Sequence, residues 1–128
     1  ADEGGRAREV VAPVRLGLAR VAGRSMEPTL RPGDLVVVLH GAPVRPGRLV
    51  VCRLPDGPMG ARPLGIKRAV CRRIDGGTVA WWVRSDNQDQ GTDSRTFGAV
   101  PAADVLAVGL ARVPRWVTRL ASRGSGAG

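Results

Sequence analysis

Residues 31–52 read RPGDLVVVLHGAPVRPGRLVVC and contain the pattern Arg-Pro-Gly-x-Leu-Val-Val twice, at 31–37 and at 45–51. Proline fixes φ and glycine tolerates positive φ, so each Arg-Pro-Gly is a turn signal. Each turn leads into an unbroken apolar run, which is typical of a buried strand. Two copies are too few for a repeat architecture. The stretch therefore predicts two buried strands that are entered by the same type of turn.

Further strand signals lie on both sides of this stretch. Apolar or alternating segments at 14–21, 64–72 and 105–113 predict three more strands. Asp75-Gly76-Gly77 is a hairpin signal, and residues 78–83 form its return strand. Connections of this kind favour antiparallel pairing. We therefore expect a mostly β, antiparallel fold with little helix.

Chain length and charge limit the classes of protein to consider. The chain has 128 residues, which indicates one domain with a real core. We expect a flexible N-terminal segment over 1–13, the folded domain over 14–113, and a basic, flexible tail over 114–128. The net charge is +9, but the arginines are scattered and aromatic residues make up 3%, too few for a base-stacking platform. Specific nucleic-acid binding is therefore not expected.

Metal and cofactor signals are sparse. With one histidine, His40, and two cysteines, the sequence lacks the ligands of a zinc site. Cys52 and Cys71 both lie in apolar, strand-like runs, which favours free thiols. An EF-hand-like spacing starts at Asp86, but its twelfth position is Phe97, where calcium requires a bidentate glutamate. We expect no metal and no cofactor.

Membrane signals in the sequence are weak as well. No apolar run approaches the roughly 18 residues that a transmembrane helix needs. We expect a cytoplasmic protein; the alternative is a membrane-associated, extracytoplasmic domain whose anchor is missing from this sequence. Peripheral contact of the basic C-terminal segment with a membrane is left open.

Lys67 is the only lysine among 20 basic residues. Arginine cannot lose its proton in a protein, whereas a buried lysine can. If residues 64–71 form a strand, Gly65, Ala69 and Cys71 share the face of Lys67. These small, uncharged neighbours would desolvate the amine and lower its pKa toward the range of a general base. The alternative is a stray lysine in an arginine-rich chain.

Ser25 is a candidate for the group that such a lysine activates. A serine hydroxyl is a weak nucleophile until a base takes its proton. Ser25 lies between Gly23 and Pro28, in a segment without regular structure. Gly23 permits close approach of a substrate backbone, so the Ser25 N–H can donate to an oxyanion. Taken alone, this segment is more typical of a turn.

Three segments together resemble the signal peptidase I family. They are GRSMEPTL with PGD (23–30 and 32–34), IKRAV (66–70), and SDNQDQGTDSR with FGAVP (85–95 and 97–101). They occur in the order of the family's nucleophile, lysine and Asp-Ser-Arg motifs, and they span about residues 20–113. Any one of them is a weak signal, but the ordered set is specific.

The resemblance implies a fold and a mechanism. The fold would be a signal-peptidase/LexA-like antiparallel β-sheet catalytic domain. Ser25 would attack the scissile carbonyl, Lys67 would act as the general base, and an acyl-enzyme would form. Gly23, Ser25 and Met26 would line the substrate cleft and oxyanion site. Supporting positions in the third motif would be Asp86, Asn87, Asp93, Ser94 and Arg95.

The sequence departs from the family pattern at three positions. The third motif usually begins with glycine, and here it begins with Ser85. Gly91 stands where the family often has a serine that hydrogen-bonds the lysine; Thr92 or Ser94 are candidates to replace it. Gly23 cannot supply the side-chain oxyanion donor that many members have two residues before the nucleophile.

Size and local similarity suggest a particular kind of member. The short Ser25–Lys67 spacing and the segments 44–47, 66–70 and 81–83 resemble small proteases that mature nickel-type superoxide dismutase. The substrate would then be a precursor protein that carries a leader peptide, and the enzyme is expected to be a monomer. One alternative is a membrane-associated type I signal peptidase. A non-enzymatic alternative is a basic module on the same fold that binds nucleic acid or protein.

Overall fold

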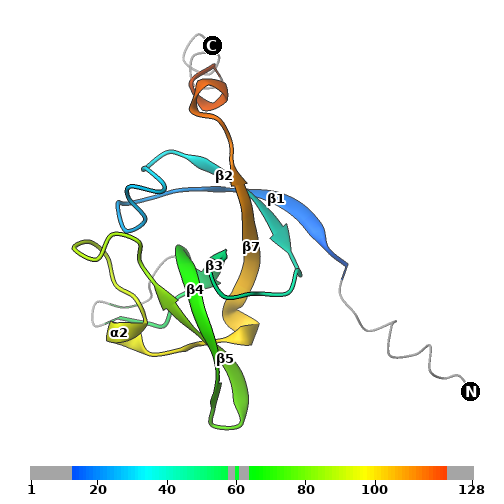
Figure 1. Cartoon of the computed structure of the whole chain (residues 1–128), viewed down its shortest axis with the longest axis vertical. Coiled ribbons are helices and arrows are strands. Elements are labelled where there is room, and N and C mark those ends of the chain that lie inside the picture. Colours follow the sequence, from blue (N-terminus) through cyan, green and yellow to red (C-terminus); the bar gives the residue numbers. More distant parts are fainter. Residues whose placement is uncertain (1–12, 58–59, 61–63, 121–128) are drawn as a thin grey trace, which may run out of the picture.

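The computed structural model describes residues 13–57, 60 and 64–120, and its seven strands form one antiparallel sheet (Figure 1). The strands are β1 (Arg15–Arg20), β2 (Leu35–His40), β3 (Leu49–Arg53), β4 (Leu64–Asp75), β5 (Thr78–Arg84), β6 (Val100–Pro101) and β7 (Val105–Arg112). A one-turn helix, α2 (Ser94–Phe97), precedes β6, and a 3-10 turn, η1 (Ala102–Asp104), follows it. The prediction of a mostly β, antiparallel fold is confirmed.

The two Arg-Pro-Gly segments form the same turn. The closing hydrogen bonds run from the Asp34 N–H to the Arg31 carbonyl (3.0 Å) and from the Arg48 N–H to the Arg45 carbonyl (3.2 Å). The third residue of each turn is glycine, with φ of 90° and 89°. Proline at the second position and a positive-φ glycine at the third are the signature of a type II turn. The predicted entry into β2 and β3 is therefore confirmed.

The β4–β5 hairpin extends from the rest of the sheet at the bottom of Figure 1. Gly76 and Gly77 have φ of 59° and 84°, and Asp75 pairs with Thr78 across the turn. Two positive φ values in a two-residue loop belong to a type I′ turn, whose twist matches that of the flanking strands. The hairpin predicted from Asp-Gly-Gly is confirmed.

Strand β7, the last strand in the sequence, lies between β2 and β3. Val108 pairs with Leu39 on one side and with Val50 on the other. Consecutive strands pair as antiparallel neighbours in β1–β2, β3–β4 and β4–β5, whereas β2 and β3 do not pair with each other. Turn residues determine where the chain reverses, whereas strand partners depend on which apolar faces pack together. β7 thus joins two groups of strands, β1–β2 and β3–β6.

A β-bulge near Val70 changes the face of strand β4. Ala69 pairs with Val83, whereas Cys71 pairs with Trp82, and the register shifts between them. Since successive residues of β5 point to opposite faces of the sheet, Ala69 and Cys71 lie on opposite faces. The prediction that Cys71 shares a face with Lys67 is therefore wrong, because the extra residue of a bulge breaks the two-residue period.

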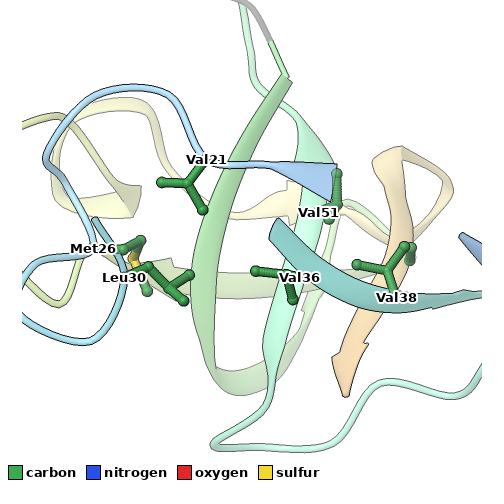
Figure 2. Close-up of a cluster of buried hydrophobic side chains, with 7 residues drawn as sticks. Val21, Met26, Leu30, Val36, Val38 and Val51 are labelled. Carbon is green, nitrogen blue, oxygen red and sulfur yellow. The ribbon is translucent and has the colours of Figure 1, made fainter. Parts of the chain in front are cut away.

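Two hydrophobic clusters form the core, one near each group of strands. The first cluster, shown in Figure 2, consists of Val21, Met26, Leu30, Val36, Val38, Val51 and Ala107. The second consists of Val50, Cys52, Ala69, Trp81, Val83 and Val100. Burying a side chain such as Leu30 or Met26 contributes roughly 1.5–3 kcal/mol. The first cluster therefore holds residues 21–30, which contain no strand of their own, against the sheet.

The ends of the chain are described only in part. The expected flexible segment 1–13 lies outside the described residues except for its last residue, and 121–128 lie outside them as well. Within the expected C-terminal tail, residues 115–120 are helical, and the Arg115 guanidinium donates two hydrogen bonds of 3.1 Å to the Asp34 carboxylate. Across 13–57, 60 and 64–120, no helix is long and apolar enough to span a bilayer.

Candidate active site

Ser25 lies on a tight turn that is anchored on its C-terminal side. Met26 and Leu30 are 1% and 2% exposed, and the Leu30 N–H donates to the Met26 carbonyl (2.9 Å). On the N-terminal side, Gly23 has a φ of 74°, and a Cβ added there would meet no atom within 4 Å. Ser25 is therefore fixed from the core side and open to a substrate from the other.

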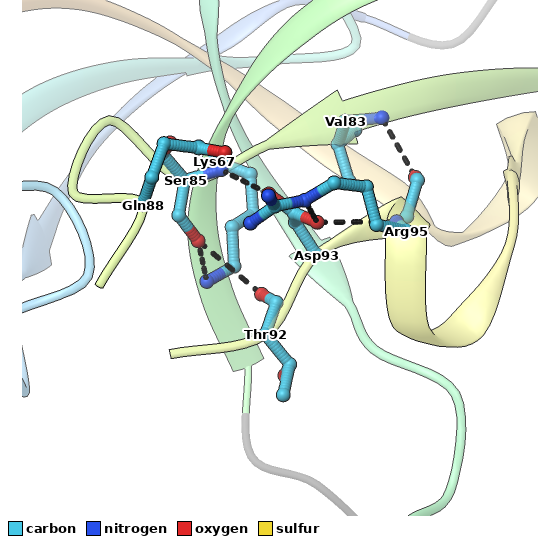
Figure 3. Close-up of polar contacts among 8 residues, drawn as sticks. Lys67, Val83, Ser85, Gln88, Thr92, Asp93 and Arg95 are labelled. Atoms are coloured by element: carbon cyan, nitrogen blue, oxygen red, sulfur yellow. Dashed lines mark hydrogen bonds and ion pairs between the residues drawn. The ribbon is translucent and has the colours of Figure 1, made fainter. Parts of the chain in front are cut away.

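Lys67 is buried near the start of β4, with 4% of its surface exposed. Its Nζ donates a hydrogen bond of 3.0 Å to the Ser85 hydroxyl (Figure 3). Burial lowers the pKa of the Lys67 amine from its ordinary 10.5, while the charges of a Cys52 thiolate and of Asp93 would oppose the shift. Burial also raises the pKa of Cys52 to about 12. Because that thiol is then neutral near pH 7, it does not hold a proton on Lys67.

Gly91 shows how close Ser25 and Lys67 lie to each other. A Cβ added at Gly91 would be 2.5 Å from Ser25 Cβ and 3.6 Å from Lys67 Nζ. Ser25 Cβ and Lys67 Nζ can therefore be no farther apart than the sum of these two distances. Both side chains line one cleft of about 470 Å³, together with Gly23, Leu64, Gly65, Gln90 and Thr92, among others.

A serine beside a buried lysine in an open cleft is an arrangement for acyl transfer, and the comparisons with known proteins agree. Residues 6–97 match the family described as Peptidase S24-like. The chain belongs to this family. It is 31% identical to mitochondrial inner membrane protease subunit 1 of Schizosaccharomyces pombe, over 77% of this chain and 76% of that protein. It is 32% identical to the protein of the same name from Xenopus tropicalis, over 64% of this chain and 59% of that protein.

Family membership confirms the fold and the enzyme class predicted from the three motifs. The chain is a serine peptidase of the S24-like family, and the non-enzymatic alternative is set aside. In the described part of this peptidase, no group of three or more histidine, cysteine, aspartate or glutamate side chains could hold a metal ion. Cys52 and Cys71 are free thiols.

Asp86 connects the three sequence motifs of the peptidase. Its carboxylate accepts hydrogen bonds from Arg68 Nε (3.0 Å) and Nη2 (2.6 Å), and from the Thr29 hydroxyl (2.6 Å). Burial would raise the pKa of Asp86, but the bonds from Arg68 and Thr29 hold it below its usual range. Thr29 belongs to the nucleophile motif and Arg68 follows Lys67, so one charged carboxylate fixes both segments relative to the third motif.

Asn87 and Met26 add two further contacts between the third motif and the nucleophile turn. The Asn87 N–H donates to the Ser25 carbonyl (2.8 Å), and its side-chain amide donates to the Arg24 carbonyl (3.0 Å). The Met26 sulfur accepts a hydrogen bond from the Asp86 N–H (3.4 Å). The prediction that Met26 lines the cleft is wrong, because its side chain is almost fully buried in the first cluster.

Asp93, Ser94 and Arg95 fasten the end of the loop to β5. The Asp93 carboxylate is buried and accepts from the Ser85 N–H (3.0 Å), the Arg95 N–H (3.1 Å) and Arg95 Nε (3.0 Å) (Figure 3). Burial alone would raise its pKa, but these bonds lower it, so Asp93 stays ionised. The Ser94 hydroxyl accepts from the Val83 N–H (2.8 Å). None of these three side chains lines the cleft of Ser25 and Lys67.

Ser85 is the site residue that the sequence reasoning missed. Thr92 and Ser94 were the candidates to contact Lys67; instead, Ser94 bonds the Val83 N–H, and Thr92 offers its carbonyl to the Ser85 hydroxyl (3.3 Å). A signal was present in the hairpin. Counting back from the Asp-Gly-Gly turn places Ser85 opposite Arg68, and the one-residue bulge in β4 moves it next to Lys67.

Proposed function

We propose that Ser25 is the nucleophile and Lys67 the general base of this peptidase, and that it removes leader peptides from precursor proteins. The observation that carries the proposal is a buried lysine amine beside the only serine that lines the described cleft. A base must be unprotonated before it acts, and burial disfavours the ammonium form of Lys67. The Asp93 carboxylate lies on the Ser85 side of the amine and limits that shift.

In the acylation step, Ser25 Oγ attacks the scissile carbonyl carbon as its proton passes to Lys67 Nζ. The carbonyl oxygen becomes an oxyanion, which the Ser25 N–H stabilises. When the tetrahedral intermediate collapses, the C–N bond breaks and the Lys67 ammonium protonates the leaving amine. The neutral amine then takes a proton from water, whose oxygen attacks the acyl-enzyme carbonyl. When this second intermediate collapses, the bond to Ser25 Oγ breaks, the Lys67 ammonium returns the proton to Ser25 Oγ, and the acid is released.

An apolar groove beside the cleft supports an extended, apolar peptide as the substrate. The groove has a volume of about 240 Å³ and shares Leu64 and Gly65 with the cleft. Leu18 from β1 and Ile66 from β4 line its two sides, with Val38, Val51 and Leu106 between them. Side chains next to the scissile bond can therefore enter an apolar environment, which suits the apolar stretch of a leader or signal peptide.

The finer assignment concerns the source of that peptide. We propose the precursor of a nickel-type superoxide dismutase, because the segments 44–47, 66–70 and 81–83 resemble the proteases that mature it. This substrate would place the enzyme in the cytoplasm, where we expect it to work as a monomer. The names of the relatives favour a second candidate, a membrane-associated peptidase that cuts signal peptides.

Cleavage assays separate these candidates. Wild type, Ser25→Ala and Lys67→Ala are incubated with a nickel superoxide dismutase precursor and with a signal-peptide substrate, and product masses are read. Either alanine variant should lower kcat/KM by at least about 10³-fold. Cleavage by wild type alone at the leader junction supports both the dyad and the precursor. Cleavage of the signal peptide alone moves the assignment to the second candidate, and equal cleavage by all three proteins overturns the dyad.

A further inference from the structure

The hydrogen bonds of Ser85 have a defined direction. The Thr92 carbonyl can only accept, so the Ser85 hydroxyl proton points to it (3.3 Å). The oxygen lone pairs of Ser85 then face Lys67 Nζ at 3.0 Å, and the amine donates. Ser85 is 1% exposed and Lys67 4%, so water does not compete for either bond.

We propose that Ser85 is the positioning residue for Lys67 in this enzyme, an inference that rests on the proposed Ser25/Lys67 dyad. A lysine amine donates N–H bonds in its charged form and in its neutral form. With one N–H directed to Ser85 in both forms, the neutral lone pair is directed away from Ser85, where the Ser25 hydroxyl can reach it. Without that bond, the amine would rotate among several orientations, and few of them are productive.

Position 91 cannot supply this hydroxyl in the present chain. A Cβ at Gly91 would lie 2.5 Å from Ser25 Cβ, far closer than a carbon contact allows, and φ there is +75°. Any side chain at position 91 therefore displaces the nucleophile. The hydroxyl has to reach Lys67 from another part of the same loop, and Ser85 at the start of that loop provides it.

The Asp-Ser-Arg segment holds Ser85 in place. The Ser85 N–H donates to Asp93 Oδ2 (3.0 Å), while Arg95 pairs with the other carboxylate oxygen (3.0 Å). The Gln88 side-chain amide also donates to the Ser85 carbonyl. Lys67, Ser85, Asp93 and Arg95 thus form one connected set, in which Ser85 links the Asp93 carboxylate to the base by hydrogen bonds (Figure 3).

The test compares Ser85→Ala with wild type in steady-state cleavage across pH. The variant should lose kcat by about 10–100-fold with little change in KM, since its substrate contacts are intact. The pH at which kcat is half-maximal should also move, because the amine has lost a partner; a purely structural defect would not move it. Ser85→Thr, which keeps the hydroxyl, should recover part of kcat. A Ser85→Ala enzyme with wild-type kcat and pH profile overturns the proposal.

Glycine variants test the steric part of the proposal. Gly91→Ala should abolish cleavage. In the matched control, Gly77→Ala, the alanine must also adopt a positive φ (84°), but no atom lies within 4 Å of its Cβ, so kcat should stay near that of wild type. The exchanged double variant, Ser85→Gly with Gly91→Ser, should stay inactive. Activity in that variant overturns the proposal. If the proposed Ser25/Lys67 dyad itself is wrong, the Ser25→Ala variant will still cleave the substrate, which distinguishes that outcome from a failure of the Ser85 proposal.

A different surface, remote from these bonds, carries a second inference. Four arginines line a cavity of about 330 Å³ between the β1–β2 connection and residues 115–120: Arg20, Arg31, Arg115 and Arg119. Asp34 neutralises Arg115 (3.1 Å), which leaves three positive charges. Thr118 also lines the cavity. The cavity therefore presents donors and positive charge that suit a phosphate group.

Exposed apolar side chains lie beside this cavity. Trp116 and Leu120 are 63% and 56% exposed, and their spacing of four puts them on one side of the helical segment, adjacent to Arg115 and Arg119. Tryptophan and arginine side by side are typical of segments that bind the interface of a bilayer. We propose that this surface docks on a membrane with anionic lipids, whose phosphates enter the arginine cavity.

Vesicle sedimentation tests the docking proposal. The protein should bind phosphatidylcholine vesicles only when phosphatidylglycerol is included, and less at high salt. Arg31→Ala with Arg119→Ala should weaken binding on the order of tenfold, and Trp116→Ala should also weaken it. The matched control, Arg45→Ala with Arg48→Ala, removes the same charge elsewhere. Equal losses in both double variants overturn the proposal, and equal binding to soluble polyglutamate would assign the surface to an acidic protein instead.

Discussion

The two side chains of the proposed dyad are placed by different kinds of structure. Lys67 lies inside β4, which is paired with β3 on one side and β5 on the other. Ser25 lies on a turn that is held by buried side chains and by the loop 85–93. The position of a side chain in a paired strand is well defined by the neighbouring strands. The position of a side chain on a turn depends on the contacts that anchor the turn. The dyad geometry therefore depends on what fastens the turn to the sheet.

The largest effect on cleavage is expected from substitution of Lys67, the member of the dyad that lies in the sheet. Lys67→Met keeps the volume of the side chain but removes the base, so cleavage should fall by at least about 10³-fold. The melting temperature should hold or rise, because a buried amine is replaced by an apolar group. Lys67→Arg should also be inactive, but less stable, because its charge cannot be lost. Cleavage assays and thermal unfolding check this; an active Lys67→Met enzyme would remove Lys67 from the mechanism.

The next largest effect is expected from Met26, whose buried side chain anchors the turn that carries Ser25. Met26→Ala should lower the free energy of unfolding by about 2–5 kcal/mol. At a temperature where it remains folded, it should also lower kcat, because the turn that carries Ser25 loses its packing. Val83→Ala in the second cluster is the matched control, with a loss of stability but a smaller effect on kcat. Denaturant unfolding and kcat are measured for both; equal effects on kcat would mean that the anchor does not position the nucleophile.

Weakening the hydrogen bonds of the Asp86 carboxylate should have a smaller effect on stability. Asp86→Asn keeps the shape but weakens the bonds to Arg68 and Thr29, at about 1–3 kcal/mol for a partly buried, charge-assisted pair. The loss in kcat should exceed that of Asp104→Asn, which removes an exposed pair with Arg53 at 3.5 Å. If both variants behave alike, the three motifs are joined by packing and not by this carboxylate.

The smallest effect is a pH dependence of stability. The folded-state pKa of Lys67 is lowered, so between that value and 10.5 the unfolded chain carries a proton that the native chain does not. The free energy of unfolding therefore rises with pH through this window. Lys67→Met lacks this dependence, so its advantage in stability over wild type should shrink as pH rises. Urea unfolding at several pH values measures the difference, and a constant difference would contradict the lowered pKa.

Local patterns in the sequence were sufficient for six of the seven strands, but not for β6 or the one-turn helix α2. Arg-Pro-Gly and Asp-Gly-Gly identified turns because few residues adopt those backbone angles. The position of β7 and the bulge near Val70 depend on contacts between residues far apart in the sequence, which no local pattern contains. The candidate site follows the same division. Ser25 and Lys67 were named from their chemistry and neighbours, whereas Ser85 required the strand register.

The place of β7 has a consequence for how the enzyme is made. This strand is the last of the sheet to leave the ribosome, yet it lies between the strands on the Ser25 side and those on the Lys67 side. A nascent chain that ends before Arg112 can form hairpins but cannot join its two halves, and pairing over such a distance in sequence is slow. Peptidase activity should therefore switch on only after synthesis of the sheet is complete, which protects the cell from an unfinished protease.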